Sequence, residues 1–277
     1  MSAYTITLLT SMGISVIFAL SLNIITGYCG QISLGHAAFY GIGAYTSAML
    51  TQAGWPFALA LPVALLLAGV VGLLVGLSSL RVRHDFLAIT TMGVGFLFIG
   101  IVRKQDWLGG ELGIAGIPAS GLGKPVFMML VVALALLTIT LCVYLKKSWL
   151  GFVFDAVAED EDTACQLGLD SARYKLTAFA LGTALAGVAG SLYAHHVRFI
   201  APDSFGFVES ISVLAMVIVG GIGSVWGVAL AAALLSVLPL WFQIIDDYKL
   251  LLYGGLLFAT MRYFPAGLAG LLHPLRR

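Results

Sequence analysis

Residues 56–80 read PFALALPVALLLAGVVGLLVGLSSL, without one charged side chain. A helix needs about 20 mostly apolar residues to cross the hydrocarbon core of a bilayer, and this stretch is long enough. Four further segments are also long and mostly apolar: residues 4–25, 125–145, 174–197 and 225–245. Each of these five segments is therefore predicted to be a transmembrane helix.

Further apolar segments are shorter or more broken, and they lie at residues 34–52, 86–102, 207–223 and 250–264. Together with the clear segments they predict about nine transmembrane helices, within a range of eight to ten. The expected fold is an all-α polytopic membrane protein in which residues 1–277 form a single transmembrane domain.

The composition agrees with this fold class. Sixty per cent of the residues are hydrophobic, 10% are charged, and the mean hydropathy is +1.03. Soluble domains carry about 25% charged residues, so this chain has too few polar groups to cover a globular surface. A soluble enzyme and a nucleic-acid-binding protein are excluded, and the net charge of +1 provides no field to attract a polyanion.

Lysine and arginine divide between two sides of the predicted membrane, and cytoplasmic loops usually carry the excess. The larger set is Arg81, Arg83, Lys146, Lys147, Arg173, Lys175, Arg262, Arg276 and Arg277. The smaller set is Arg103, Lys104, Lys124, Arg198 and Lys249. We expect the larger set to be cytoplasmic, which puts the C-terminus inside and, with nine helices, the N-terminus outside.

Sequence signatures of catalysis are missing. No G-x-x-x-x-G-K-[ST] motif occurs, so the chain does not bind ATP through a P-loop. The three cysteines are far apart, and neither a catalytic triad nor a metal site is recognisable. We expect no enzyme activity, no cofactor and no metal. A membrane protein of this kind moves a solute, and three classes are open: an ATP-driven importer, an ion-coupled secondary transporter and a passive channel.

Acidic residues in the spans distinguish these classes. Glu209 is the one acid inside a predicted segment, close to its outer edge, and is interpreted as an interfacial residue. Ion-coupled carriers use intramembrane carboxylates, so their near absence argues against that class.

A polar, glycine-rich run interrupts the apolar pattern at Gly27-Tyr28-Cys29-Gly30-Gln31-Ile32-Ser33-Leu34-Gly35-His36. Irregular backbone at membrane depth is tolerated only where it is buried in protein or lines a cavity. One interpretation is a broken helix whose Gln31, Ser33 and His36 face the substrate pathway. The other is a connecting turn in which Ser33 caps a helix. A second glycine-rich break, residues 220–227, lies in the other half of the chain, as in transporters built from related halves.

Residues 146–173 form the longest hydrophilic stretch, on the expected cytoplasmic side. Its middle is predicted to form one short amphipathic helix with Val153, Val157, Ala164 and Leu167 as apolar positions, ended by Gly168 as C-cap. Such a helix is a natural contact for a soluble partner; the alternative is a solvated loop. The acidic run 159–162 either pairs with basic groups of that partner or is merely solvated.

Small residues recur every fourth position in the segment 174–197, at Ala178, Gly182, Ala186, Gly190 and Ala194. This spacing places them on one helix face, where they permit close approach of a neighbouring helix. We expect a packing face here.

Several motifs in order resemble those of the branched-chain amino-acid ABC-transporter permeases. They are Gly27-Tyr28-x-Gly30-Gln31-Ile32-Ser33-Leu34-Gly35-His36-Ala37-x-Phe39-x-Gly41-Ile42-Gly43-Ala44-Tyr45, Leu167-Gly168 with Arg173-Tyr174-Lys175-Leu176, Ala201-Pro202-x-Ser204-Phe205, Gly220-Gly221-Ile222-Gly223-Ser224-x-x-Gly227, and Phe264-Pro265-x-Gly267-Leu268-x-Gly270-Leu271. Among the paired permeases of such systems the chain resembles the M-type subunit.

The resemblance implies an ABC importer permease fold, and an inner-membrane subunit that forms half of the pathway for branched-chain amino acids or a related small solute. It also implies partners: two ATP-binding subunits, a second paralogous permease and a periplasmic solute-binding protein. The segment Asp162-Thr163-Ala164-x-x-x-Gly168, with Leu167, resembles a degenerate E-A-A-x-x-x-G loop that couples importer permeases to the ATPase, with Asp for Glu and Thr for Ala.

Overall fold

A computed structural model describes residues 2–79, 84–241, 249–264 and 267–272. This part of the chain contains an apolar helix on each of the nine predicted segments. They are α1 (Ala3–Asn23), α2 (His36–Gln52), α3 (Phe57–Ser79), α4 (His84–Lys104), α5 (Lys124–Lys147), α8 (Ser171–Val197), α9 (Phe207–Gly220), α10 (Val225–Trp241) and α12 (Lys249–Tyr263). The prediction of an all-α polytopic membrane protein is confirmed.

Length separates these helices into two groups. Within the described residues, six helical stretches are long and apolar enough to cross a membrane, namely Ala3–Tyr28, Phe57–Leu77, Leu87–Lys104, Lys124–Lys147, Ser171–Val197 and Pro202–Gly220. Helices α2, α10 and α12 have 17, 17 and 15 described residues. At a rise of about 1.5 Å per residue, the described part of each of these three helices is shorter than the hydrocarbon core.

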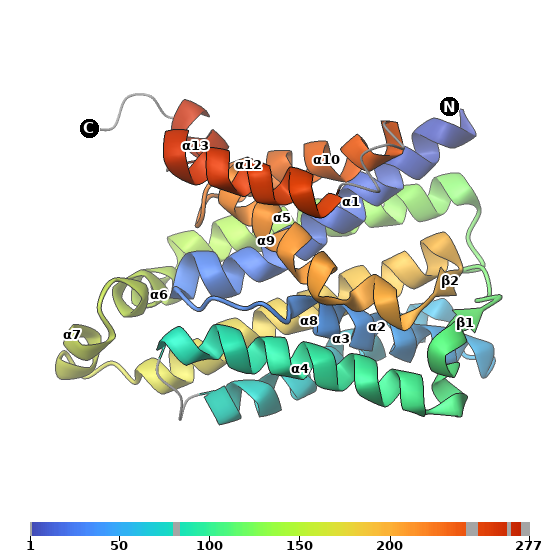
Figure 1. Ribbon diagram of the computed structural model, residues 1–277, viewed down its shortest axis with the longest axis horizontal. Helices are drawn as coiled ribbons and strands as arrows, with labels where there is room; N and C mark the ends of the chain where they lie inside the picture. The colour runs from blue at the N-terminus through green and yellow to red at the C-terminus, as the bar shows by residue number, and fades with distance from the viewer. Residues whose placement is uncertain (1, 80–83, 242–248, 265–266, 273–277) are drawn as a thin grey trace.

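The remaining elements are short and lie in the connections. They are η1 (Ile24–Tyr28), η2 (Asp106–Leu108), η3 (Gly110–Leu112), β1 (Ile114–Ala115), α6 (Trp149–Glu159), α7 (Glu161–Gln166), β2 (Phe199–Ile200), η4 (Pro202–Phe205) and α13 (Gly267–Leu272). Strands β1 and β2 pair antiparallel, with Ile114 opposite Ile200. They lie at one end of the molecule and α6 and α7 at the other (Figure 1).

The two predicted sets of basic residues follow these ends. Helix α5 ends at Lys147 beside α6, and α8 begins at Ser171 just after α7, so four members of the larger set lie at the α6–α7 end. Helix α4 ends at Lys104 and α5 begins at Lys124, both at the end with β1 and β2. Arg81, Arg83, Arg276 and Arg277 lie outside the described residues.

Helix α8 packs at the centre of the bundle against α1, α2 and α3. The predicted small-residue face is buried along its whole length. A Cβ at Gly190 would overlap the carbonyl oxygen of Tyr40 on α2, and one at Gly182 would overlap that of Ser21 on α1. The stripe therefore permits backbone-to-backbone packing of α8 with two neighbours, as expected.

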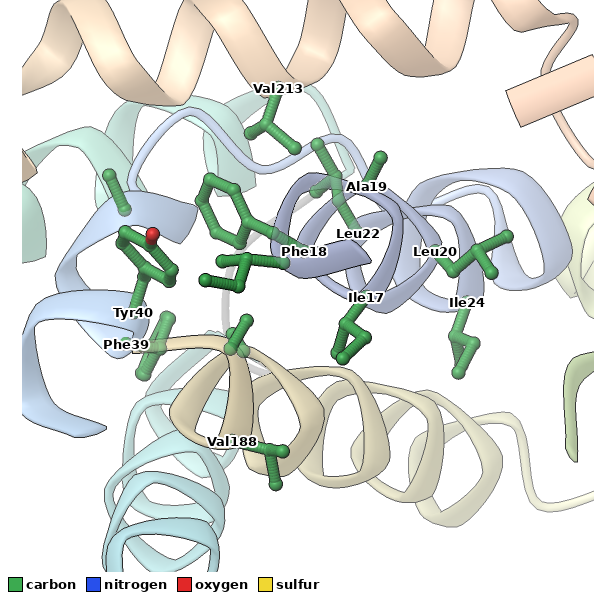
Figure 2. Close-up of a cluster of buried hydrophobic side chains, with 14 of the residues drawn as sticks. Ile17, Phe18, Ala19, Leu20, Leu22, Ile24, Phe39, Tyr40, Val188 and Val213 are labelled. Atoms are coloured by element: carbon green, nitrogen blue, oxygen red, sulfur yellow. The ribbon is translucent and has the colours of Figure 1, made fainter. Parts of the chain in front are cut away.

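Aromatic side chains fill the space between α1 and α2. The Phe18 and Tyr40 rings stack with centroids 4.3 Å apart, and Figure 2 shows the two rings facing each other beside α8. Phe39, next to Tyr40, meets Phe179 of α8 edge-on at 5.6 Å. These contacts fix α2 against α1 and α8, and so fix the irregular segment that precedes α2.

Candidate functional site

The predicted helix break follows α1. The last turn widens into the π-helix η1, Gly30 takes a left-handed φ of +68°, and regular helix resumes only at His36. In Figure 1 the chain returns from the end of α1 toward the middle of the molecule before α2 begins. The interruption of regular helix that the sequence predicts at this position is confirmed.

Neighbouring helices hold this break in place. The Leu34 amide donates to Thr91 Oγ1 of α4 over 3.1 Å, and the Ala37 amide donates to Ser210 Oγ of α9 over 3.1 Å. A Cβ at Gly35 would overlap the backbone carbonyl of Thr91, so α4 approaches too closely for any other residue. Amides that helix geometry leaves free are thus satisfied by side chains from other spans.

The three predicted pathway residues Gln31, Ser33 and His36 are all buried. His36 Nε2 lies 2.8 Å from Ser21 Oγ. Gln31 Oε1, Ser33 Oγ and His36 Nδ1 have no hydrogen-bond partner among the described residues. Since buried polar atoms are nearly always bonded, each of these atoms is suited to bind water or a polar solute.

Ser33 does not cap α2, so that part of the alternative interpretation is wrong, although the segment does connect η1 to α2. The N-cap of α2 is Gly35, and it makes no side-chain capping bond. Ser33 lies two residues before this cap, in the irregular part of the break, and its hydroxyl makes no hydrogen bond to the first amides of the helix.

The second glycine-rich break joins α9 to α10 and contacts the first one. Gly221 and Gly223 have φ values of +101° and +79°, which favour glycine. The Gly223 amide donates to Asn23 Oδ1 at the end of α1, and the Lys146 ammonium donates to the Gly223 carbonyl. A Cβ at Gly27 would overlap the Gly223 nitrogen. The sequence predicts both breaks but not the contact between them, because no local sequence pattern encodes a contact between distant segments.

Residues 146–173 contain two helices, α6 and α7, instead of the one amphipathic helix predicted. Asp160 separates them with extended backbone at φ −156°, and its carboxylate accepts from the amides of Asp162 and Thr163. An N-cap residue has a non-helical backbone, so Asp160 cannot lie inside one continuous helix. The prediction of a single helix was therefore wrong.

The end of α7 agrees with the prediction. Gly168 has φ +87°, its amide donates to the Cys165 carbonyl, and the Leu169 amide donates to the Ala164 carbonyl. This is the Schellman pattern, which needs a left-handed residue at the position of Gly168.

The predicted apolar positions divide between two surfaces. Val153, Val157 and Ala164 are buried within the chain, whereas Leu167 is 77% exposed. The four positions therefore do not form the single apolar face that the sequence predicts. Exposed Trp149 and Phe152 on α6 were not singled out from sequence, because periodicity gives no indication of which side of a short helix faces its own chain.

The acidic run is partly used within the chain. The Glu161 carboxylate pairs with Lys175 of α8. The Thr163 hydroxyl and the amides of Thr163 and Asp162 hold the pKa of Asp160 below its ordinary value. Asp162, Thr163 and Glu159 are exposed. The part of the run that remains available to a partner is therefore Glu159 and Asp162.

Within the described ranges, no three His, Cys, Asp or Glu side chains gather in a way that could hold a metal ion.

Known proteins resemble this chain along nearly its whole length. The family model described as branched-chain amino acid transport system / permease component matches residues 4–261. The high-affinity branched-chain amino acid transport system permease protein LivM of Escherichia coli (strain K12) is 36% identical, over 98% of this chain and 71% of the relative. LivM of Salmonella typhimurium is 37% identical, over 94% and 69%. LivH of Escherichia coli (strain K12) is 25% identical, over 92% and 90%. No solved structure matches the chain.

Proposed function

Because the chain belongs to the family of branched-chain amino acid transport permeases, we propose that it is the M-type, inner-membrane permease subunit of an ATP-driven importer. The solute is a branched-chain amino acid or a related small molecule. One observation carries the proposal: Lys146 binds Gly223, the residue through which the two backbone breaks contact each other. Lys146 lies in the last turn of α5, just before the α6–α7 segment. A movement of that segment reaches both breaks through a single side chain.

ATP hydrolysis belongs to separate subunits, since the chain has no P-loop motif. Their docking site is the α6–α7 end, where the large side chains of Trp149, Phe152 and Leu167 are exposed outside the spans. Asp162 and Thr163 lie on the same exposed segment and complete the coupling residues predicted from sequence. Ala164 and Gly168 act indirectly, because they hold the shape of α7.

Gln31, Ser33 and His36 line the solute pathway in this proposal. Their unpartnered polar atoms gather in a break between spans, where a passing zwitterion needs donors and acceptors. The three groups are few and neutral or weakly basic, which favours passage over tight retention.

The remaining components follow from the importer class. A second, paralogous permease completes the pathway, and a periplasmic solute-binding protein delivers the solute to the end that carries β1 and β2. The α6–α7 end then faces the cytoplasm, in agreement with its larger share of lysine and arginine.

Two exposed leucines at opposite ends of the molecule test the proposal. Leu167 is 77% exposed and Leu112 of η3 is 86% exposed. In proteoliposomes with the complete transporter, we expect ATP-driven leucine uptake that a protonophore does not reduce. Leu167→Asp should abolish co-purification of the ATP-binding subunits, whereas Leu112→Asp should leave it intact. Uptake that collapses with the proton gradient at constant ATP would identify an ion-coupled carrier instead.

A further inference from the structure

A cavity of about 630 Å³ opens at the end of the molecule opposite α6 and α7. Its walls come from the first half of α1, the start of α5, the end of α8 and residues 119–122. Small-molecule sites usually occupy about 300–1,000 Å³, so the volume suits a ligand of amino-acid size together with some water.

The lining combines an apolar wall with charges of both signs. Ile6, Ile14 and Phe127 supply the apolar surface. Lys124 and Arg198 supply positive charge, and Glu209 supplies negative charge. A ligand that matches all three kinds of surface carries a carboxylate, an ammonium group and an apolar side chain.

His195 also lines the cavity. Its side chain is buried, with 5% exposure, and its ring packs on Phe57 with centroids 4.5 Å apart. Nδ1 lies 2.9 Å from the Ser191 carbonyl oxygen, which can only accept, so Nδ1 carries the proton. The lone pair of a neutral ring is then on Nε2, and this atom has no partner in the described part of the chain. A buried acceptor in a cavity wall is suited to an ammonium donor.

We propose that this cavity binds the zwitterion of an amino acid with an apolar side chain, as the first site that the solute occupies after it leaves the binding protein. The proposal rests on the function proposed above and adds to it a binding site with assigned groups. His195 Nε2 accepts from the ammonium, Lys124 and Arg198 attract the carboxylate, and the wall of Ile14 and Phe127 packs on the side chain.

The cavity adjoins the predicted pathway through aromatic rings. Tyr40 lines the cavity and stacks on Phe18, as Figure 2 shows, and Phe18 stacks on His36 with centroids 5.5 Å apart. Two stacked rings, those of Tyr40 and Phe18, thus lie between the cavity and His36, the first residue after the break.

Photolabelling tests the site directly. The probe is a diazirine derivative of leucine, applied to the assembled transporter in nanodiscs without the binding protein, and labelled peptides are identified by mass spectrometry. We expect labels on the cavity residues of α1, α5 and α8. Excess leucine should compete, and N-acetyl-leucine, which lacks the ammonium, should compete at least about tenfold more weakly.

Three variants complete the test. Ser15→Leu places bulk in the cavity and should lower labelling at least about fivefold, whereas Thr140→Leu adds bulk on an exposed position of α5 and should not. His195→Phe keeps the ring against Phe57 and removes the acceptor, so it should abolish the preference for leucine over N-acetyl-leucine. Equal competition by both compounds in the parent protein would overturn the zwitterion site in favour of a lipid or detergent pocket.

ATP-driven uptake by the same purified transporter, reconstituted with the binding protein in proteoliposomes, separates this inference from the proposed function, because nanodiscs enclose no compartment. Uptake without competed labelling in the cavity would overturn the site and leave the importer assignment intact. Competed labelling without ATP-driven uptake would support the site and overturn the importer assignment.

Discussion

The Gly223 amide donates a hydrogen bond to Asn23 Oδ1 over 2.9 Å, across 200 positions of sequence. Asn23 is the last residue of α1, and Gly223 lies between α9 and α10. The bond ties the first backbone break to the second, and the Lys146 ammonium binds the carbonyl of the same glycine. The two breaks and the end of α5 thus meet at one residue.

Replacing Asn23 with leucine should destabilise the protein by about 1–3 kcal/mol, because the buried Gly223 amide loses its acceptor. Thermal unfolding in detergent measures the change. Thr140→Val is the matched control: Thr140 Oγ1 bonds the Leu136 carbonyl of its own helix, so its loss should cost little. Equal effects of the two variants would contradict the role of Asn23 as the connection between the breaks.

Lys146→Met should reduce ATP-driven uptake while the ATP-binding subunits still co-purify. The substitution keeps the length of the side chain but removes the bond to Gly223 and the cation 5.7 Å from the Tyr28 ring centroid. The expected loss of stability is only about 1 kcal/mol, since the residue is exposed. Lys147→Met, on the next position, should transport normally. Unimpaired uptake by Lys146→Met would show that coupling takes another route.

Gly43→Ala should destabilise the bundle by about 1–3 kcal/mol or prevent its assembly, because the added methyl group would overlap the Gly187 backbone of α8. Gly100→Ala on α4 has open space around it and should be neutral or slightly stabilising. Yield of monodisperse protein and thermal unfolding provide the comparison. A tolerant Gly43 would mean that α2 and α8 are further apart than described.

Gly168→Ala should destabilise the end of α7 by about 1–2 kcal/mol, since alanine is unfavourable at φ +87°. Gly168→Asn should be milder, because asparagine tolerates the left-handed region. Hydrogen exchange of the Leu169 amide, which donates to Ala164, reports the change. If both variants exchange at the rate of the parent protein, the Schellman turn does not form in the assembled transporter.

Asp160 makes α7 sensitive to acid. Its folded-state pKa is lowered by the Thr163 hydroxyl and by two amides, so the carboxylate stabilises the cap above the ordinary aspartate pKa of about 3.9. That contribution is lost as the pH falls through the lower folded-state pKa. Thr163→Val should move the pKa of Asp160 upward toward its ordinary value, measured by carboxyl NMR titration. Thr177→Val, which removes a bond within α8, should leave it unchanged.

Many features could be predicted from the sequence because they depend on local properties. Each of the nine predicted segments contains a helix, since burial of apolar residues in lipid is decided over windows of about 20 residues. The glycine-rich run 27–36 was recognisable as a break because its polar residues and glycines interrupt the apolar pattern. The left-handed turn at Gly168 follows from the helix-ending role of glycine.

Tertiary structure alone decided which surfaces of these elements meet. The burial of Ala164 and the exposure of Leu167 depend on how α7 rests on its own chain, and a six-residue helix is too short for its periodicity to distinguish two faces. The contact of Gly223 with Asn23 and the cavity beside His195 arise from packing between segments far apart in sequence. Hydropathy determines that a segment enters the membrane. Shape complementarity between helices determines which residues the segment contacts there, and one-dimensional sequence patterns do not contain that information.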